Sequence, residues 1–233
     1  MKKIFIATAV ALSLSAAAQA AESTAVLKVT GVLTNDACTP MLDGGGVVDF
    51  GTKYINELSA TQTNQLGYKD VSFTISCSVP TKVGFAISDD SADSAASVTI
   101  EHTSFTDPDE QAWTSTQRFG VGKTAGGVNI GAYSVALNRS AVTADGQPQA
   151  VLRAEAGINA WHGLSGTSDL LINSGLYNYS LGDATDKDSE APVAFTTAVF
   201  PLRIALAVQN TDTLAITDNT DINGQSTITL IYL

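Results

Sequence analysis

The segment from residue 25 to residue 33 has an apolar residue or glycine at every second position, and a cysteine follows it closely. Its odd positions hold apolar residues or glycine, namely Ala25, Leu27, Val29, Gly31 and Leu33. A period of two is typical of an extended strand with one apolar side. Two interpretations are open. The segment is either the ordinary first strand of a β-sandwich, which the pattern alone favours, or a strand handed to a neighbouring molecule.

Residues 1–20 have the pattern of a secretory signal peptide. Lys2 and Lys3 precede a short apolar run, and residues 18–20 read Ala-Gln-Ala, a small-x-small cleavage site. The apolar run is too short to span a bilayer. We therefore expect an exported chain that begins at Ala21, with an extension over residues 21–34 and one domain over residues 35–233.

The composition of the remaining chain excludes some partners. Without Lys2 and Lys3, ten basic residues face 23 acidic ones, so the net charge is −13 compared with −11 for the whole sequence. Such a surface repels phosphate backbones and anionic lipid, so nucleic acid is not an expected partner. A length of 213 residues suits one all-β domain with a substantial core.

The two cysteines, Cys38 and Cys77, are expected to form a structural disulfide. They are the only pair in the sequence, and export places them in an oxidising compartment. Closing a loop of about 40 residues stabilises a fold by roughly 4 kcal/mol in the chain-entropy model. Neither a CxxC motif nor an activating base is visible, so catalytic use of these thiols is not expected.

Short strands separated by Gly, Asn and Asp indicate an all-β fold, a β-sandwich. The clearest alternation covers residues 71–77. The expected strands are residues 47–50, 71–77, 83–87, 98–101, 151–154, 195–208 and 227–233, together with several short glycine-spaced strands within residues 119–137. Asn223-Gly224 predicts a hairpin turn before the last strand. Two polar insertions, residues 89–117 and 156–192, are expected to be loops, with their acidic clusters in solvent.

No constellation for catalysis or metal binding stands out. His102 and His162 are about sixty residues apart with no ligand-spaced Cys, Asp or Glu, and no GxSxG motif is present. The segment from Asn219 to Gly224 begins like a calcium loop, but its twelfth position is Leu230 instead of glutamate. We expect no enzyme, no cofactor and no metal.

Several of these segments together resemble the pilins of chaperone–usher fimbriae, the type 1 and P pilus families. Gly31 stands seven residues before Cys38, within VTGVLTNDAC, and the segment from Val48 to Gly51 precedes the strand that ends at Cys77. Tyr232 is the penultimate residue. The resemblance covers the first ~60 residues after the leader well and the last ten moderately. It looks closest to a branch of fimbrial-like exported proteins longer than the major pilins.

The resemblance implies an immunoglobulin-like sandwich that lacks its last strand. Ala25, Leu27, Val29, Gly31 and Leu33 would form a donor strand, and Ile228, Leu230 and Tyr232 would line the acceptor edge. The implied partners are a periplasmic pilus chaperone, an outer-membrane usher and neighbouring fimbrial subunits. The implied function is a structural role in surface adhesion by donor-strand exchange. The implied location is the periplasm in transit and then the cell-surface fimbrium.

A second hypothesis belongs to a different class. Trp113 and Trp161 lie in polar, glycine-containing segments, where an exposed aromatic ring could stack on a sugar. Anchoring of a loop against the core is the commoner fate of such residues. The alternative function is therefore a free periplasmic or fimbrial-tip β-sandwich protein that binds carbohydrate, with host glycan as the partner.

Overall fold

The structure is a computed structural model that describes residues 28–31, 37–164, 168–185 and 190–233. The chain divides into two units, residues 1–34 and residues 35–233. Within the first unit only residues 28–31 are described, and they are exposed and outside any helix or strand. The signal peptide and most of the extension lie outside the described residues, so both stay predictions.

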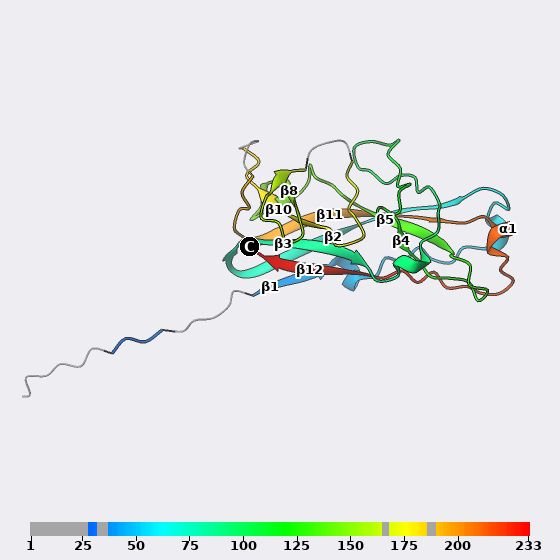
Figure 1. Cartoon of the computed structure of the whole chain (residues 1–233), viewed down its shortest axis with the longest axis horizontal. Coiled ribbons are helices and arrows are strands. Elements are labelled where there is room, and N and C mark those ends of the chain that lie inside the picture. The colour runs from blue at the N-terminus through cyan, green and yellow to red at the C-terminus, as the bar shows by residue number, and fades with distance from the viewer. Residues whose placement is uncertain (1–27, 32–36, 165–167, 186–189) are drawn as a thin grey trace, which may run out of the picture. The chain divides into compact units, whose positions relative to one another are not determined.

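The described part of the second unit folds into two antiparallel sheets (Figure 1). The first sheet has the order β1-β2-β11-β5-β4, with β6 paired to β11 and β7 paired to β6. Its strands are β1 (Cys38–Leu42), β2 (Asn64–Thr81), β4 (Phe119–Gly120), β5 (Gly131–Leu137), β6 (Thr143–Ala144), β7 (Gln147–Pro148) and β11 (Phe195–Val208).

The second sheet has the order β12-β3-β10-β8-β9. Its strands are β3 (Val83–Asp89), β8 (Ala150–Glu155), β9 (His162–Gly163), β10 (Tyr177–Gly182) and β12 (Ser226–Tyr232). The described helices are short: η1 (Asp43–Gly46), η2 (Ile55–Glu57), η3 (Ala92–Ser94) and α1 (Thr211–Leu214). Within the described residues, no helix has the length and apolar character needed to cross a membrane.

The main core lies between the two sheets and is rich in aromatic side chains. Phe73 of β2 and Phe200 of β11 meet Phe85 of β3, with ring centroids 5.1 and 5.0 Å from the Phe85 ring. Alternate residues of each strand point to one face of a sheet, so the period of two in β2 and β11 delivers these rings to the same layer. The two sheets therefore form a β-sandwich of immunoglobulin-like type, as the sequence predicted.

The strand predictions were accurate where alternation is strong. Residues 195–208 form β11 with the expected bounds, and the last strand, β12, starts and ends one residue earlier than predicted. The predicted strand 71–77 is part of the longer β2, which continues through Pro80 because its outer residues still pair with β11.

Four local predictions were wrong. Residues 98–101 form no strand, and Ile100 makes only an isolated bridge to Ala112. Residues 47–50 form no strand, and β10 lies inside the segment 156–192 that was expected to be a loop. The sequence of β10 has few apolar residues, but pairing with β8 and β3 on its two sides stabilises it as a strand. Asn223 and Gly224 lie in an irregular segment before β12 and do not turn a hairpin, because no strand precedes them to pair with β12.

Part of the first insertion forms a third layer, which corrects the expectation of a solvated loop. Ala96, Val98, Ile100 and Ala112 are buried against the outer face of β5 and β11. That face consists of small residues, Ala132, Ala136, Ala205 and Ala207, so the layer can approach the sheet closely. Leu170, from the second insertion, joins the same cluster.

Candidate strand-accepting groove

The two sheets leave a groove between their first and last edges. β1 is the edge of one sheet and β12 is the edge of the other, and no described strand pairs with their outer sides. Beyond β1, the wall on one side continues through residues 43–50, and ahead of β12 the wall on the other side consists of residues 216–225. The groove is therefore bounded by the two free edges of the sandwich.

Two cavities occupy the groove. The first has a volume of about 430 Å³ and lies between Leu42 and Phe50 on one wall and Ile222 and Ile228 on the other. Its floor is apolar and comes from both sheets: Val71, Ile87, Val121, Tyr133, Val135, Leu202, Ile204 and Leu206. An elongated apolar floor between two walls suits an extended peptide with side chains on one face.

The second cavity has a volume of about 760 Å³ and continues the groove toward α1. Ile55 and Leu58 line one side, and Ile216 and Ile222 line the other. Val48, Phe50, Ile222 and Asn223 belong to the linings of both cavities, so the two are neighbours. The acidic residues Asp49, Asp218 and Asp221 surround the apolar lining of the second cavity.

The backbone of β12 directs polar groups toward the groove. Leu233 N donates to Lys82 O, and Asp90 N donates to Gln225 O. In an antiparallel ladder, alternate residues turn both backbone groups toward the partner and the others turn both away. The N–H and C=O groups that point away from β3 therefore belong to the even-numbered residues of β12: Ser226, Ile228, Leu230 and Tyr232.

Three of these even-numbered residues are the predicted acceptor edge. The side chains of Ile228 and Leu230 are half-buried and pack against the main core, whereas the ring of Tyr232 is 53% exposed. Side chains that face the core and backbone groups that face outward are the combination that an added strand requires. Strand addition at this edge stays a prediction, because no second chain is present.

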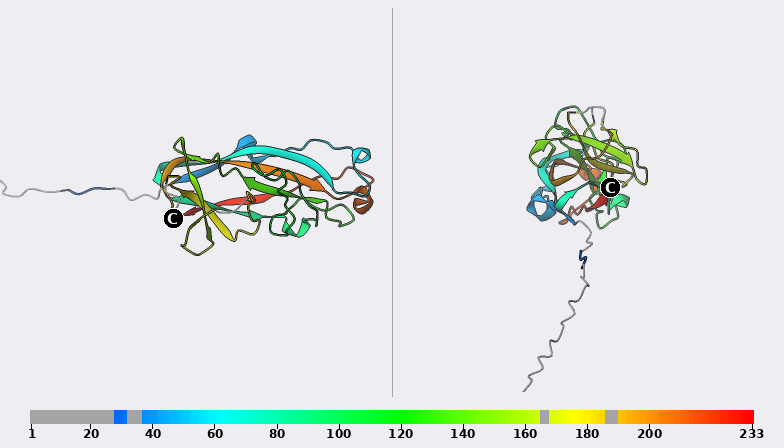
Figure 2. Two further views of the ribbon diagram at one scale, coloured as in Figure 1. Left: turned by 90° about the horizontal axis from the view of Figure 1, so that it is seen from above. Right: turned by 90° about the vertical axis from the view of Figure 1, so that its left-hand side faces the viewer.

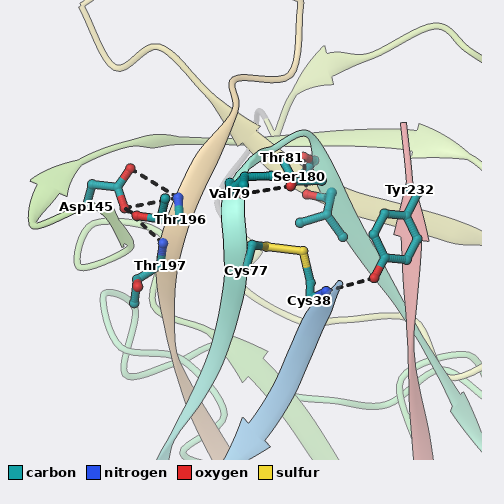
Figure 3. The surroundings of a disulfide bond; sticks show 10 residues. Cys38, Cys77, Val79, Thr81, Asp145, Ser180, Thr196, Thr197 and Tyr232 are labelled. Atoms are coloured by element: carbon teal, nitrogen blue, oxygen red, sulfur yellow. Dashed lines mark hydrogen bonds between the residues drawn. A yellow bond between two sulfur atoms is a disulfide. The ribbon is translucent and has the colours of Figure 1, made fainter. Parts of the chain in front are cut away.

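The opposite edge, β1, offers fewer partners near the disulfide. Cys38 and Cys77 are bonded as predicted and join the start of β1 to β2 (Figure 3). Ala37 O accepts from Ser78 N, so Cys38, Pro40 and Leu42 turn their backbone groups away from β2. Pro40 has no N–H to donate. The amide of Cys38 donates to the hydroxyl of Tyr232 at 2.9 Å.

Carboxylates hold the beginning of β12 in place. Asp90 accepts from the side chains of Gln225 and Thr227 at 3.2 and 2.8 Å. Asp89 accepts from the amides of Gly120 and Ser91. Burial raises the pKa of Asp89 despite these two amide donors, which act in the opposite direction.

Gly224 is a wall residue that the sequence did not reveal as important for the groove. A Cβ atom at this position would lie 2.7 Å from Gly120 O and 2.8 Å from Cε1 of Tyr133. Burial raises the pKa of Tyr133 well above its ordinary value, although a hydrogen bond with the side chain of Ser226 acts in the opposite direction. The sequence signal was present as Asn223-Gly224, but it indicated a turn instead of a close backbone approach.

The predicted donor strand is described only in part. Val29 is 86% exposed, and nothing lies within 4 Å of a Cβ built on Gly31. Ala25, Leu27 and Leu33 lie outside the described residues. Their role as donor residues stays a prediction.

The two tryptophans have different environments. Trp161 is 4% exposed and packs with Leu152 and Ala154, so it anchors a loop and cannot present its ring to a sugar. Trp113 is 67% exposed. The described residues hold no group of three or more His, Cys, Asp or Glu side chains placed to bind a metal.

Comparison with known proteins relates this chain to uncharacterised proteins. A family model described as a protein of unknown function, DUF1120, matches residues 27–134. The "Uncharacterized protein YhcF" of Escherichia coli K12 is 28% identical over 253 aligned residues, which cover 99% of this chain and 98% of that protein. "Protein GltF" of the same strain is 29% identical over 262 aligned residues, which cover 100% of this chain and 99% of that protein.

Proposed function

We propose that this chain is a non-enzymatic structural subunit of a chaperone–usher fimbria, joined to other copies by donor-strand exchange. The groove between β1 and β12 would accept residues 25–33 of a second copy. The observation that carries this proposal is the outward-facing backbone edge of β12 beside an apolar floor. An unpaired sheet edge over an uncovered core is costly in isolation, and an added strand removes both costs.

The length of the donor segment suits the groove. Eight residue steps separate Ala25 from Leu33, and eight separate Ile222 from Leu230 along the acceptor wall. In extended conformation the donor segment spans about 27 Å. Within the described residues, Val29 is already exposed and thus available to a partner.

The direction of insertion follows from where the chain enters the domain. β12 runs from the α1 end of the sandwich to the disulfide end, where Tyr232 meets Cys38 (Figures 1 and 2). An incoming strand antiparallel to β12 places Leu33 at the α1 end. The folded domain that follows Leu33 then lies beyond that end, opposite to the end where the acceptor's own extension joins Cys38. Such an arrangement would repeat head to tail.

The burial of the donor side chains supplies a large stabilisation. Leu27, Val29 and Leu33 would contribute roughly 5–9 kcal/mol at 1.5–3 kcal/mol each. That is comparable to the net stability of a whole domain. Gly31 would lie where the groove admits backbone and leaves no room for a side chain.

The other partners belong to the same proposal. A periplasmic chaperone would cover the groove before assembly, and an outer-membrane usher would be the place of exchange. The chain would be exported through its leader and would end in a cell-surface fimbrium. The family match from residue 27 includes all but the first two residues of the donor segment and both cysteines, which is consistent with a unit made of extension and domain.

Carbohydrate binding is a second candidate function, supported by the exposure of Trp113. The test is a glycan array probed with the unchanged chain and with Trp113→Ala. Binding that disappears in the variant supports this function, and an array without signal counts against it.

The test of donor-strand exchange compares three forms of the chain without its leader. The first is unchanged, the second lacks residues 21–34, and the third carries Leu27→Ser and Leu33→Ser. We expect heat-resistant, SDS-stable ladders from the first form only, because the other two cannot fill a neighbour's groove. A matched control, Ile158→Ser, removes an exposed apolar side chain outside the groove and should leave the ladders intact.

A synthetic peptide of residues 21–34 separates binding from assembly. We expect it to bind the Leu27→Ser/Leu33→Ser chain and to protect the amides of Ile228 and Leu230 from hydrogen exchange. Unchanged ladders after deletion of residues 21–34 contradict the donor role. A peptide that binds without protecting β12 contradicts the acceptor role of this edge.

A further inference from the structure

We propose that the hydrogen bond between Tyr232 and Cys38 closes the groove at the disulfide end and sets the register in which the donor strand of a second copy stops. This inference rests on the proposed function and adds a positioning role for Tyr232. The bond joins the last residues of β12 to the first residue of β1, so it spans the space between the two edges (Figure 3).

The disulfide makes this closure firm. Cys38 is held on β2 through Cys77, and the C-terminal end of β12 is held on β3 by the bond from Leu233 N to Lys82 O. Each partner of the Tyr232–Cys38 bond is therefore attached to a different sheet. A strand that passes between them has to break this bond, which reduces its affinity about threefold to tenfold.

Two further observations place the end of the groove at the same point. The linings of both cavities include no residue of β1 before Leu42 and none of β12 beyond Ile228. Pro40 removes one outward amide from the β1 edge, and Tyr232 already occupies the amide of Cys38. The disulfide half of β1 thus gives an incoming backbone little to pair with, while β12 still offers Leu230.

The closure assigns a register to the donor strand. With Leu33 at the α1 end, Ala25 reaches Leu230, and residues 21–24 lie outside the groove. Side chains alternate in a strand, so any slip that keeps Leu27, Val29 and Leu33 on the core face moves the strand by two residues. Without the Tyr232–Cys38 bond, the strand could slip two residues toward the disulfide end. Gly31 would then no longer lie where the groove leaves no room for a side chain.

The experiment maps the register with a photo-crosslinker. A peptide of residues 21–34 carrying benzoylphenylalanine at position 25 is bound to the Leu27→Ser/Leu33→Ser chain and irradiated, and mass spectrometry locates the link. We expect one cluster of links centred on Leu230, at residues 229–231. In the same chain with Tyr232→Phe, we expect a second cluster near Leu233 and the β2–β3 connection, since only the hydroxyl has been removed.

Peptide truncation gives an independent readout. In the chain that retains Tyr232, peptides 21–34 and 25–34 should bind within about twofold of each other, because residues 21–24 make no contact. In the Tyr232→Phe chain, the longer peptide should bind at least threefold more tightly than the shorter one. Tyr54→Phe is the matched control, since Tyr54 is also exposed and its substitution leaves the closure intact.

The outcomes separate the two proposals. Peptide binding with the same single cluster of links in both chains overturns the register role of Tyr232 and leaves donor-strand exchange standing. A large contribution of residues 21–24 in the chain with Tyr232 overturns the closure as well. If no peptide binds at all, the proposed function fails and this inference fails with it.

Discussion

At the scale of single residues, the groove depends on a glycine that has no side chain and on a tyrosine that hydrogen-bonds to the opposite wall. Gly224 brings the backbone ahead of β12 against Gly120 and the ring of Tyr133, and this contact forms part of the wall of the first cavity. Tyr232 connects the two walls at the other end. Neither role is visible in residue type alone, because both arise from contacts between distant parts of the chain.

The close contact at Gly224 predicts a cost for any side chain there. Gly224→Ala places a Cβ atom within 2.8 Å of two neighbours, one of them the backbone oxygen of Gly120. We expect a loss of about 1–3 kcal/mol in the free energy of unfolding, measured by urea denaturation. Gly163→Ala is the control, because nothing lies within 4 Å of its added Cβ. Equal stability of the two variants would contradict the packing described here.

Asp145 provides a prediction about pH. Its carboxylate accepts from the hydroxyl and amide of Thr196 and from the amide of Thr197, and these bonds lower its pKa below the ordinary value near 3.8 (Figure 3). A lowered pKa in the folded state means that the charged form stabilises the fold. This contribution is complete above the unfolded pKa and is lost as the pH falls through the folded pKa.

Asp145→Asn should therefore destabilise the chain at pH 7 and have little effect at low pH. Asp145 has a φ of 48°, a conformation that Asn tolerates, so the turn itself is preserved. We expect a difference below about 1 kcal/mol at pH 7, since an exposed carboxylate is screened by solvent. Urea denaturation at a series of pH values measures it. A difference that grows as the pH falls below 3.8 would be inconsistent with this sign.

At the scale of elements, the insertion between β3 and β4 covers one face of the first sheet. Asp169 accepts from Ser104 and Thr106 hydroxyls in the insertion, and it forms an ion pair with Arg139 at 2.9 Å. Arg203 of β11 lies over the rings of Tyr68 and Phe105, 3.8 and 4.3 Å from their centroids. The same strands, β5 and β11, carry much of the groove floor on their inner face. The third layer therefore supports the floor from behind.

Removal of the Asp169 carboxylate tests this support. Asp169→Ala removes the carboxylate that pairs with Arg139 and accepts from the hydroxyls of Ser104 and Thr106, so we expect a loss of about 3–5 kcal/mol. Hydrogen exchange should also show weaker protection of the paired amides of Ile100 and Ala112. The control is Asp93→Ala, which breaks an ion pair whose carboxylate is 82% exposed and should have little effect on the free energy of unfolding. Similar effects in both variants would rule out a special role for Asp169.

At the scale of the whole molecule, the proposed exchange places neighbouring domains close together. Only residues 34–37 separate Leu33 from Cys38, so the two Cα atoms are at most about 18 Å apart. A donor strand seated in one copy thus holds the domain that follows it near the α1 end of that copy.

Lengthening this connection should separate assembly from stiffness. Six Gly and Ser residues inserted between Thr34 and Asn35 leave residues 25–33 unchanged, so the SDS-stable ladders should persist. The assembled fibres should bend more strongly in electron micrographs, because a flexible linker replaces a short one. An equal-length insertion in the turn at Gly157, an exposed position, serves as the control. If the ladders are lost with the lengthened linker, binding of residues 25–33 in the groove is not sufficient for assembly, which would contradict this prediction.

The sequence by itself determined the class of fold, the disulfide and the main strands. Alternation at period two, as in residues 195–208, reflects one buried face and needs no knowledge of the partner strands. The pairing of Cys38 with Cys77 followed because no other cysteine exists. The same pattern predicted that Ile228, Leu230 and Tyr232 share one face of the last strand, whereas their role as an acceptor edge came from the resemblance and stays a prediction.

The tertiary structure alone decided what surrounds these elements. β10 has a weak pattern and is a strand because two neighbours pair with it. Part of the first polar insertion forms a buried layer because the alanines of β5 and β11 let it approach. The hydrogen bond between Cys38 and Tyr232 and the close approach of Gly224 to Gly120 join residues more than a hundred positions apart. Such contacts leave no periodic trace in a sequence, because each one depends on the position of both chain segments.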